Sequence, residues 1–307
     1  MDEKKKEFIN NFVEKRNVLD EKNFDLVLKK LDDFFRSFFC EIIEENQGEV
    51  EFNLKLIGDY FLKTNYDFCD SSTIMIEYVV NDENYFLSEK RAQKNDFGKL
   101  LFDSFNGKNL YPTSENILTR LYNHLLLNLQ NIKVFKRNNG IALRFLDYNF
   151  FIFIFVKTTQ EKNYNFLIKG KEYSFNFDLM HENLLKKNEQ TKGNFFKLIK
   201  FYKIIERELF LLNKLKNPNT KTLYFYENIL YNIPNEMLME NFIFDSFLNS
   251  FAYLSEHKDE LKNASNQSLF VENEYKLFAK YYVTKYDIKM LLKQCKIFIK
   301  NVDEIIK

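Results

Sequence analysis

Apolar residues recur at helical spacing near the start of the chain and over most of its second half. Between residues 4 and 46, the spacing of Phe8, Phe12, Leu31 and Phe35 predicts one or two amphipathic helices. A stripe that begins after Ser114, a candidate N-cap, predicts another helix. Five more are expected at residues 178–189, 193–215, 223–232, 239–257 and 285–305, with Pro218 and Pro234 between some of them.

Runs rich in β-branched and aromatic residues predict strands in the first half. Strands are expected near Glu51–Ile57 and over Thr73–Val80, and three more between residues 132 and 158. Asn138-Asn139-Gly140 suits a hairpin turn. The run FFIFIFV, residues 150–156, is far too short to span a bilayer and is interpreted as a fully buried strand. A short β-ribbon is expected at residues 268–283.

This order of elements predicts an α+β protein. Residues 1–177 are expected to form an α/β lobe with N-terminal helices around a mixed sheet, and residues 178–307 a helical lobe. The chain has 307 residues, of which 45% are hydrophobic and 17% aromatic, so it can bury a large core and is not disordered. Trp is absent while Lys, Asn, Ile and Phe are abundant, which indicates an AT-rich genome.

Charge and cysteine usage exclude several classes of function. Lys plus Arg is 45 and Asp plus Glu is 44, so no overall basic field calls for nucleic acid, although a local patch stays possible. Cys40, Cys69 and Cys295 form no metal-binding motif and are interpreted as reduced, buried thiols. The charged N-terminus has no apolar segment typical of a signal peptide. We therefore expect a cytoplasmic protein without structural metal or membrane partner.

Four strings, in this order, resemble the cyclic-oligonucleotide-synthase and oligoadenylate-synthetase branch of the nucleotidyltransferases. GDYFLKTNYDFCDSSTIMIEYVV is similar to the family's phosphate loop and acidic strand, and FDLMHENLLKKNEQTKGNFFKLIKFYKII to its link into a Lys-bearing helix. LYFYENILYNIPNEMLMENFIFDSFLNSFAYL resembles its helix followed by Tyr-Asn-x-Pro and is the most specific string. YYVTKYDIKMLLKQCKIFIKNV resembles the closing helix.

The resemblance implies a nucleotidyltransferase fold and a reaction that needs two Mg²⁺ ions on nucleotide phosphates. Two carboxylates on one strand and a third on the neighbouring strand would hold those ions. Here the pair falls at Ser71 and Thr73, or one residue earlier at Asp70 and Ser72. The third position lies within FFIFIFV and is Phe or Ile. At most one of the three acids remains.

Other family positions are partly kept. Gly58 and Thr64 match the phosphate loop, whereas Asp59 replaces its Ser and Lys63 its second Gly. Lys203 matches the Lys that contacts phosphate, and Lys200 lies one turn before it. Leu223 replaces a phosphate-contacting Ser. Four further matches, whose role in the family is largely structural, are Glu227, Tyr231, Asn232 and Pro234.

Three hypotheses follow. The first is a catalytically degenerate protein that binds a nucleotide, RNA or protein partner as a scaffold or regulator, with Gly58, Thr64, Lys200 and Lys203 as its nucleotide-binding residues and no cofactor. The second is an active nucleotidyltransferase that makes a nucleotide second messenger or tails RNA, with Mg²⁺ held by an unusual pair, Asp70 and Glu77. The third is a protein-interaction module that keeps only the fold.

Each candidate also has an ordinary structural interpretation. Lys200 and Lys203 are typical of the solvated face of an amphipathic helix, and Glu77 of the solvated face of a strand. Asp70 suits a turn or cap, and Gly58 and Thr64 suit a turn before a strand.

Overall fold

The computed structural model describes a large part of the chain in thirteen segments. They are residues 1–15, 21–46, 50–58, 71–80, 114–129, 132–137, 140–145, 148–158, 164–168, 171–175, 177–215, 225–258 and 285–305. Thr64, Asp70, Cys69, Leu223 and the expected ribbon at residues 268–283 lie outside these segments. Contacts divide the chain into two compact units, one built on the sheet and one helical. Each unit is described by itself.

A mixed sheet forms the centre of the first unit. Five strands follow the order β1-β2-β5-β4-β3, and β6 and β7 continue from β5. All neighbours pair antiparallel except β2 and β5, which run parallel. The strands are β1 (Val50–Ile57), β2 (Ser71–Val80), β3 (Ile132–Arg137), β4 (Gly140–Phe145), β5 (Tyr148–Thr158), β6 (Tyr164–Ile168) and β7 (Lys171–Phe175).

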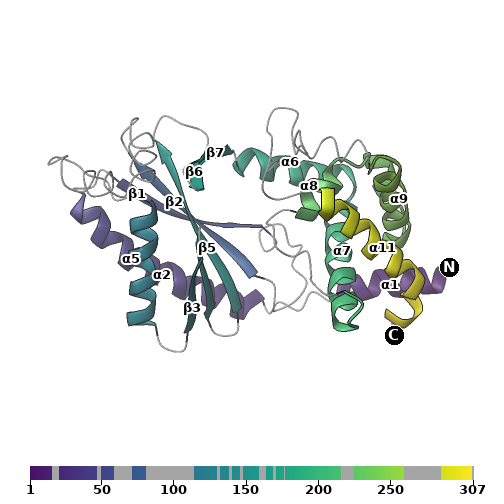
Figure 1. Ribbon diagram of the computed structural model, residues 1–307, viewed down its shortest axis with the longest axis horizontal. Coiled ribbons are helices and arrows are strands. Elements are labelled where there is room, and N and C mark those ends of the chain that lie inside the picture. Colours follow the sequence, from purple (N-terminus) through teal and green to yellow (C-terminus); the bar gives the residue numbers. More distant parts are fainter. Residues whose placement is uncertain are drawn as a thin grey trace. The chain divides into compact units, whose positions relative to one another are not determined.

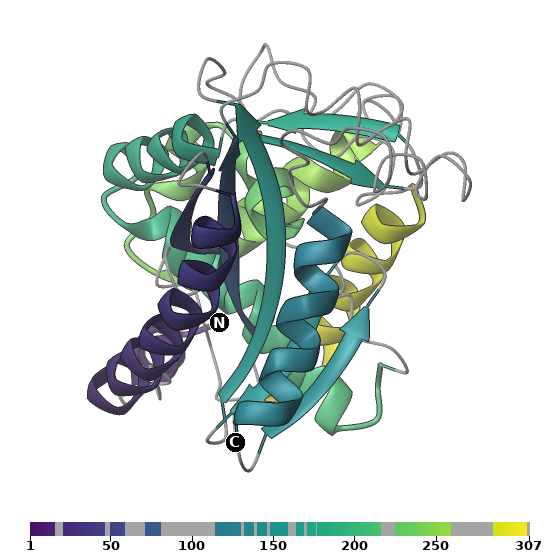
Figure 2. The same ribbon diagram turned by 90° about the vertical axis from the view of Figure 1, so that its left-hand side faces the viewer.

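Two helices, α2 (Glu21–Glu45) and α5 (Ser114–Asn128), supply the rest of the core of this unit. Figure 2 shows both helices in front of the sheet. Because side chains alternate along a strand, each strand sends every second residue under these helices. The buried residues of this layer include Ile74, Ile76, Phe150 and Ile152, packed with Phe35 and Leu121.

The alternate residues of β5 lie on the other face of the sheet, which we call the open face. Phe151 and Phe153 are there, and both are partly exposed. The interpretation of residues 150–156 as a fully buried strand was therefore wrong for these two residues. The period of 2 explains why: only one side of the strand packs against α2 and α5.

The second unit is helical (Figure 1). Its elements are α6 (Phe177–Gln190), α7 (Asn194–Leu211), α8 (Phe225–Tyr231), the short 3₁₀ helix η1 (Asn235–Leu238), α9 (Ile243–Glu256) and α11 (Lys285–Ile305). The N-terminal helix α1 (Glu3–Lys15) also belongs to it and packs on α7 and α9. The expected division had placed α1 with the sheet lobe, because helical periodicity alone does not show which partner a helix covers.

Two further expectations are corrected by the described residues. Cys295 is buried as predicted, and burial raises the pKa of its thiol to about 12, but Cys40 on α2 is exposed. Strands β6 and β7 were not predicted, because their segments lack a run of apolar residues as clear as that of β5. The helices and strands expected elsewhere in the described segments are present.

Candidate functional site

The resemblance leaves two registers for the paired carboxylates. In one, Ser71 and Thr73 take these positions, on the open face of β2 and β5; in the other, Asp70 and Ser72 take them, and Ser72 is paired with Phe150. Thr73, Met75 and Glu77 of β2 lie directly opposite Phe151, Phe153 and Phe155 of β5. The three phenylalanine rings follow one another along β5, with centroids 4.2 Å apart for Phe151 and Phe153 and 6.0 Å apart for Phe153 and Phe155. Thr73 and Met75 are buried.

These described residues do not fit a pair of Mg²⁺ ions. Mg²⁺ requires hard oxygen ligands in octahedral geometry. Across from each other, the strands offer one hydroxyl, one thioether, the single carboxylate of Glu77 and the phenyl rings of β5. No group of three His, Cys, Asp or Glu side chains in the described segments is placed to hold a metal ion. Asp70 is outside those segments, so its part in the site stays a prediction.

Glu77 does not lie on a solvated face, as the sequence had suggested. Its side chain is 6% exposed and is flanked by lysines of both neighbouring strands: Lys157 Nζ lies 3.5 Å away and Lys55 Nζ 3.9 Å away. Two nearby ammonium groups compensate the burial of this carboxylate. Glu77 also lies six residues beyond Ser71 on an extended strand, a span of about 20 Å, which separates it from any acid at the start of β2.

Gly58 ends β1 in a conformation that favours glycine. Its φ is 78°, in the left-handed region, and the residue is buried. A side chain at this φ would strain the backbone, which explains the glycine at this turn. This conformation agrees with a phosphate loop and equally with an ordinary tight turn. Thr64, its expected companion, lies outside the described residues.

Lys203 on α7 is engaged inside the helical unit. Its ammonium lies 3.3 Å from the Glu227 carboxylate of α8, and the Glu227 side chain is 1% exposed. Removing either charge would leave the other buried without this partner. The structural role expected for Glu227 is consistent with this ion pair to Lys203. A phosphate that bound Lys203 would have to share its ammonium group with the Glu227 carboxylate.

Lys200, one turn earlier, is buried, so its interpretation as a solvated residue was wrong. Burial lowers the pKa of this lysine to about 8, and the charge of Glu14 on α1 partly opposes that shift. Residues 197, 200 and 203 lie three apart along α7, and α1 packs against this helix. Lys197 itself is exposed and pairs with Glu14 at 3.0 Å.

Lys187 on α6 is a residue that the sequence analysis missed. Its ammonium donates to the Ile233 carbonyl and to Asn235 Oδ1, both at 2.8 Å, and lies over the Tyr231 ring. Burial lowers its pKa to about 8. This lysine fixes the Tyr-Asn-x-Pro segment, which explains why that string is structural. The sequence signal was its place one turn after the buried Leu184 on α6.

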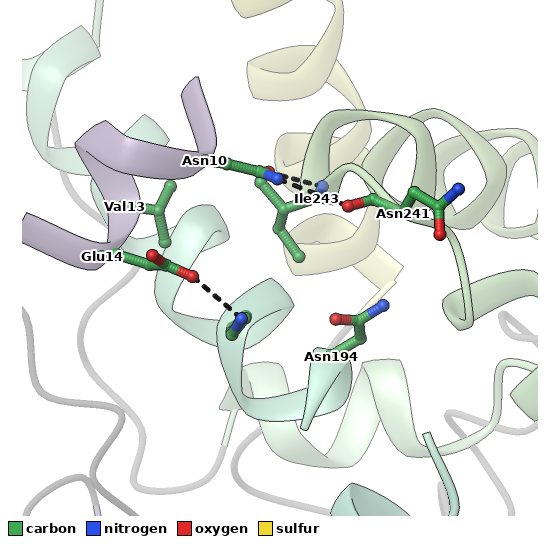
Figure 3. A pocket seen from close by; sticks show the side chains of 7 residues that line it. Asn10, Val13, Glu14, Asn194, Asn241 and Ile243 are labelled. Carbon is green, nitrogen blue, oxygen red and sulfur yellow. Dashed lines mark hydrogen bonds and ion pairs between the residues drawn. The ribbon is translucent and has the colours of Figure 1, made fainter. Parts of the chain in front are cut away.

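A small polar pocket lies where α1 meets the starts of α7 and α9 (Figure 3). Asn10 of α1 accepts a hydrogen bond from the Ile243 backbone N–H at 2.8 Å and donates to the Asn241 carbonyl. Phe242, at the N-cap position of α9, makes no side-chain hydrogen bond to the start of this helix. Asn10, from α1, provides the capping hydrogen bond instead. Glu14 and Lys197 also line the pocket and form an ion pair at 3.0 Å. The pocket is part of how α1 docks.

Comparison with known proteins agrees with this architecture. Residues 182–307 match the model of the cGAS/DncV-like nucleotidyltransferase C-terminal helical domain. A search of curated proteins finds no match.

Solved structures with the same fold are distant in sequence. The structure of Escherichia coli MS115-1 CdnC with ATP is 11% identical, with a TM-score of 0.61 over 97% of this chain and 91% of that one. The Elizabethkingia meningoseptica CdnE cyclic dinucleotide synthase, with GTP and Apcpp, is 12% identical, with a TM-score of 0.58 over 87% of this chain and 91% of that one. The Rhodothermus marinus CdnE c-UMP-AMP synthase is 14% identical, with a TM-score of 0.57 over 89% of this chain and 91% of that one.

The fold is thus that of a nucleotidyltransferase, a sheet lobe followed by a helical domain. Within that class the chain is cGAS/DncV-like in its fold and in its C-terminal domain, which confirms the resemblance found in the sequence. None of the helices in the described segments combines the length and apolar character needed to cross a membrane.

Proposed function

We propose that this chain is a catalytically degenerate nucleotidyltransferase-fold protein that acts as a binding scaffold or regulator for a nucleotide, RNA or protein partner. The observation that carries the proposal is the pairing of Thr73 with Phe151 in the parallel strands. In the family that the sequence resembles, oxygen ligands from the two corresponding strands are expected to hold the metal ions. Here a phenyl ring lies opposite a hydroxyl, and a phenyl ring has no lone pair for Mg²⁺.

Phosphate binding in this proposal relies on backbone and ammonium groups instead of metal. Gly58 and Thr64 would offer N–H groups, and Lys203 with Lys200 would offer positive charge. Lys203 is shared with Glu227 and the pKa of Lys200 is lowered, so both lysines bind phosphate less strongly than exposed ones. We therefore expect weak nucleotide binding with little dependence on Mg²⁺. Calorimetry with ATP and GTP, with and without Mg²⁺, measures this; tight binding that disappears on chelation contradicts it.

A second candidate, an active enzyme, is favoured by the fold it shares with proteins described as cyclic dinucleotide synthases. It requires Asp70 and Glu77 to act together. The ion pairs of Glu77 with Lys55 and Lys157, and its distance from the start of β2, weigh against this ligand set.

Incubation with labelled nucleoside triphosphates, Mg²⁺ or Mn²⁺ and several RNAs separates the two candidates. We expect no incorporation and no cyclic product above a heat-treated control. Asp70→Ala tests the candidate ligand, and Glu51→Ala, at an exposed acid on β1, is the control. Product that is lost in Asp70→Ala but kept in Glu51→Ala would establish an active enzyme and contradict the degenerate interpretation.

The third hypothesis, a protein-interaction module, is supported by a relative. One structure with this fold, with a TM-score of 0.60 and 11% identity, is described as a complex of CdnC with HORMA-deltaN. Size-exclusion chromatography of this chain with a candidate partner protein tests that role. Co-elution without any nucleotide binding in the calorimetry would favour it over the nucleotide scaffold.

A further inference from the structure

One end of the open face carries exposed aromatic and basic residues that the proposed function does not use. β3 is the last strand of the sheet in the described segments, and Phe135 on it is 56% exposed. Lys133 and Arg144, which lie opposite each other in β3 and β4, are exposed as well. By contrast Met75, on the same face of β2, is fully buried. Ligands can therefore reach the face at its β3–β4 end.

Phe135 and Phe151 are separated by a small residue on the strand between them. Ala142 of β4 lies opposite Phe135 on one side and opposite Phe151 on the other. Because neighbouring strands are about 4.8 Å apart, the Cα atoms of the two phenylalanines are about 10 Å apart. Only the methyl group of Ala142 therefore lies between the two aromatic residues in this row.

Gly140 shows which way the inner ring leans. A Cβ atom on Gly140 would lie 2.7 Å from Phe151 Cε1. The Phe151 ring therefore extends from β5 toward β4, over the glycine and beside Ala142. The absence of a side chain at Gly140 lets the ring lie low on the sheet, as a platform on which a base can stack.

The basic pair lies at the right distance for a phosphate. Lys133 is two residues from Phe135, and Arg144 is two residues from Ala142, so both share this face and lie about 7 Å along the strands from the aromatic row. Proteins that bind single-stranded nucleic acid combine aromatic side chains on an open sheet face with nearby positive charge. Lys133, Phe135, Ala142, Arg144 and Phe151 supply both features.

We propose that these five residues form a binding site for a nucleobase and its phosphate, in which the base stacks on the Phe151 ring beside Phe135 and the phosphate pairs with Lys133 and Arg144. The base comes either from a single-stranded nucleic acid or from a free nucleotide. The site uses none of Gly58, Thr64, Lys200 and Lys203, and it needs no metal. It therefore stands whether or not the chain catalyses nucleotidyl transfer.

The absence of tryptophan provides a direct test. The chain has no Trp, so Phe135→Trp introduces a single fluorescent reporter at the proposed platform. Stacking of a base on this indole quenches its emission. We expect quenching on addition of a single-stranded RNA and none with the same sequence as a duplex, whose bases are already stacked. Adenosine monophosphate is titrated in parallel. Equal quenching by the mononucleotide identifies a free nucleotide as the ligand, and quenching by the strand alone identifies nucleic acid.

Variants separate stacking from nonspecific attraction. In the Phe135→Trp background, Ala142→Leu fills the space between the rings and is expected to abolish quenching, while Lys133→Gln lowers the salt dependence of binding. In the parent, Phe135→Ala is expected to weaken RNA binding about tenfold in fluorescence anisotropy. Leu127→Ala, at an apolar residue of α5 that is 83% exposed, is the matched control and should leave binding unchanged.

Two results would overturn the proposal. One is the absence of quenching by both the single strand and the mononucleotide, with a thermal melt showing that Phe135→Trp is folded. The other is quenching that persists in Ala142→Leu or occurs equally with duplex RNA. Nucleotide binding that is lost in Lys203→Gln but unaffected by Phe135→Ala would support the proposed function and reject this site, so the two failures are distinguishable.

Discussion

Thr73 lies directly opposite Phe151 in the parallel pair of β2 and β5. The two strands thus keep the arrangement that brings ligands from neighbouring strands together in the nucleotidyltransferase fold, while one of the facing side chains is entirely apolar. The apolar pattern of the buried face and the backbone pairing set this register, so under the proposed function the fold persists although the residues of the site differ. On this face β5 contributes contacts between phenylalanines, and Glu77 of β2 forms ion pairs with Lys55 and Lys157.

The two faces of β5 should respond differently to a new carboxylate. Ile152 is fully buried beneath the helices, and Ile152→Asp would place a charge there without a partner, at a cost of several kcal/mol. That is a large part of the roughly 5–15 kcal/mol that stabilises a typical domain. Phe153 is partly exposed on the open face, so Phe153→Asp should cost less, roughly 2 kcal/mol. Thermal and urea unfolding, with and without Mg²⁺, measure both.

Neither aspartate variant should gain stability from Mg²⁺. If Phe153→Asp melts like the parent and Mg²⁺ raises its melting temperature, the open face can assemble a metal site with residues outside the described segments, and the degenerate interpretation of this strand is wrong.

Gly140→Ala should destabilise the sheet through contact with β5. The new Cβ would lie 2.5 Å from the Ile152 carbonyl oxygen and 2.7 Å from Phe151 Cε1, both closer than such atoms approach. A cost of roughly 1–3 kcal/mol is expected. Adding Phe151→Ala should recover only part of this, because the carbonyl belongs to the backbone and remains in place. Urea unfolding of the single and double variants measures the cost of Gly140→Ala with and without the Phe151 ring. If Gly140→Ala costs nothing in the Phe151→Ala background, the ring alone restricts this position.

Asn10→Ala should loosen the start of α9. The side chain accepts a hydrogen bond from the Ile243 N–H, and loss of a helix cap typically costs about 1 kcal/mol. Amide exchange at Ile243 should become faster, as measured by NMR. Asn11, the exposed neighbour on α1, provides a control: Asn11→Ala should leave that exchange rate unchanged. Equal rates in Asn10→Ala and the parent would mean that this hydrogen bond does not protect the helix start.

Local patterns predicted the elements well but not which residues meet. The apolar period located β2 and β5, and the family resemblance located Lys203, yet the partners of these elements depend on the whole fold. Glu77 shows this: a lone acid in a strand suggests a solvated face, and only the sheet order brings Lys55 and Lys157 to either side of it. Lys187 was missed for the same reason, because its acceptors lie 46 and 48 residues away.

Lys200 also illustrates why burial escapes prediction, since its spacing with Lys197 and Lys203 is typical of a solvated helix face. The helix α1, from the N-terminal end of the chain, packs against α7. No pattern within α7 indicates that contact. The exposed site around Phe135 is likewise invisible in sequence, because its members come from three strands and are related only by register.

The lowered pKa of Lys200 predicts a specific pH dependence of stability. In the unfolded chain this lysine loses its proton near its ordinary pKa of 10.5, and in the folded protein near 8. Between these values the unfolded state binds more protons than the folded state, so the free energy of unfolding rises with pH. Below about pH 8 the lysine is charged in both states and the full cost of burying its charge is present. Above about 10.5 it is neutral in both, and that cost is gone.

Lys200→Met removes the titrating group and keeps an unbranched side chain. The parent should therefore gain stability relative to this variant as pH rises from about 8 to 10.5, by roughly 2–3 kcal/mol. Cys295 and the buried tyrosines Tyr202 and Tyr226 titrate equally in both proteins, so their effects cancel in the difference. Urea unfolding at four or so pH values gives the curve, and Lys186→Met, at an exposed lysine of α6, is the control for the loss of a lysine charge. A difference between parent and Lys200→Met that stays constant with pH would mean that Lys200 keeps its ordinary pKa and remains a fully charged candidate for phosphate.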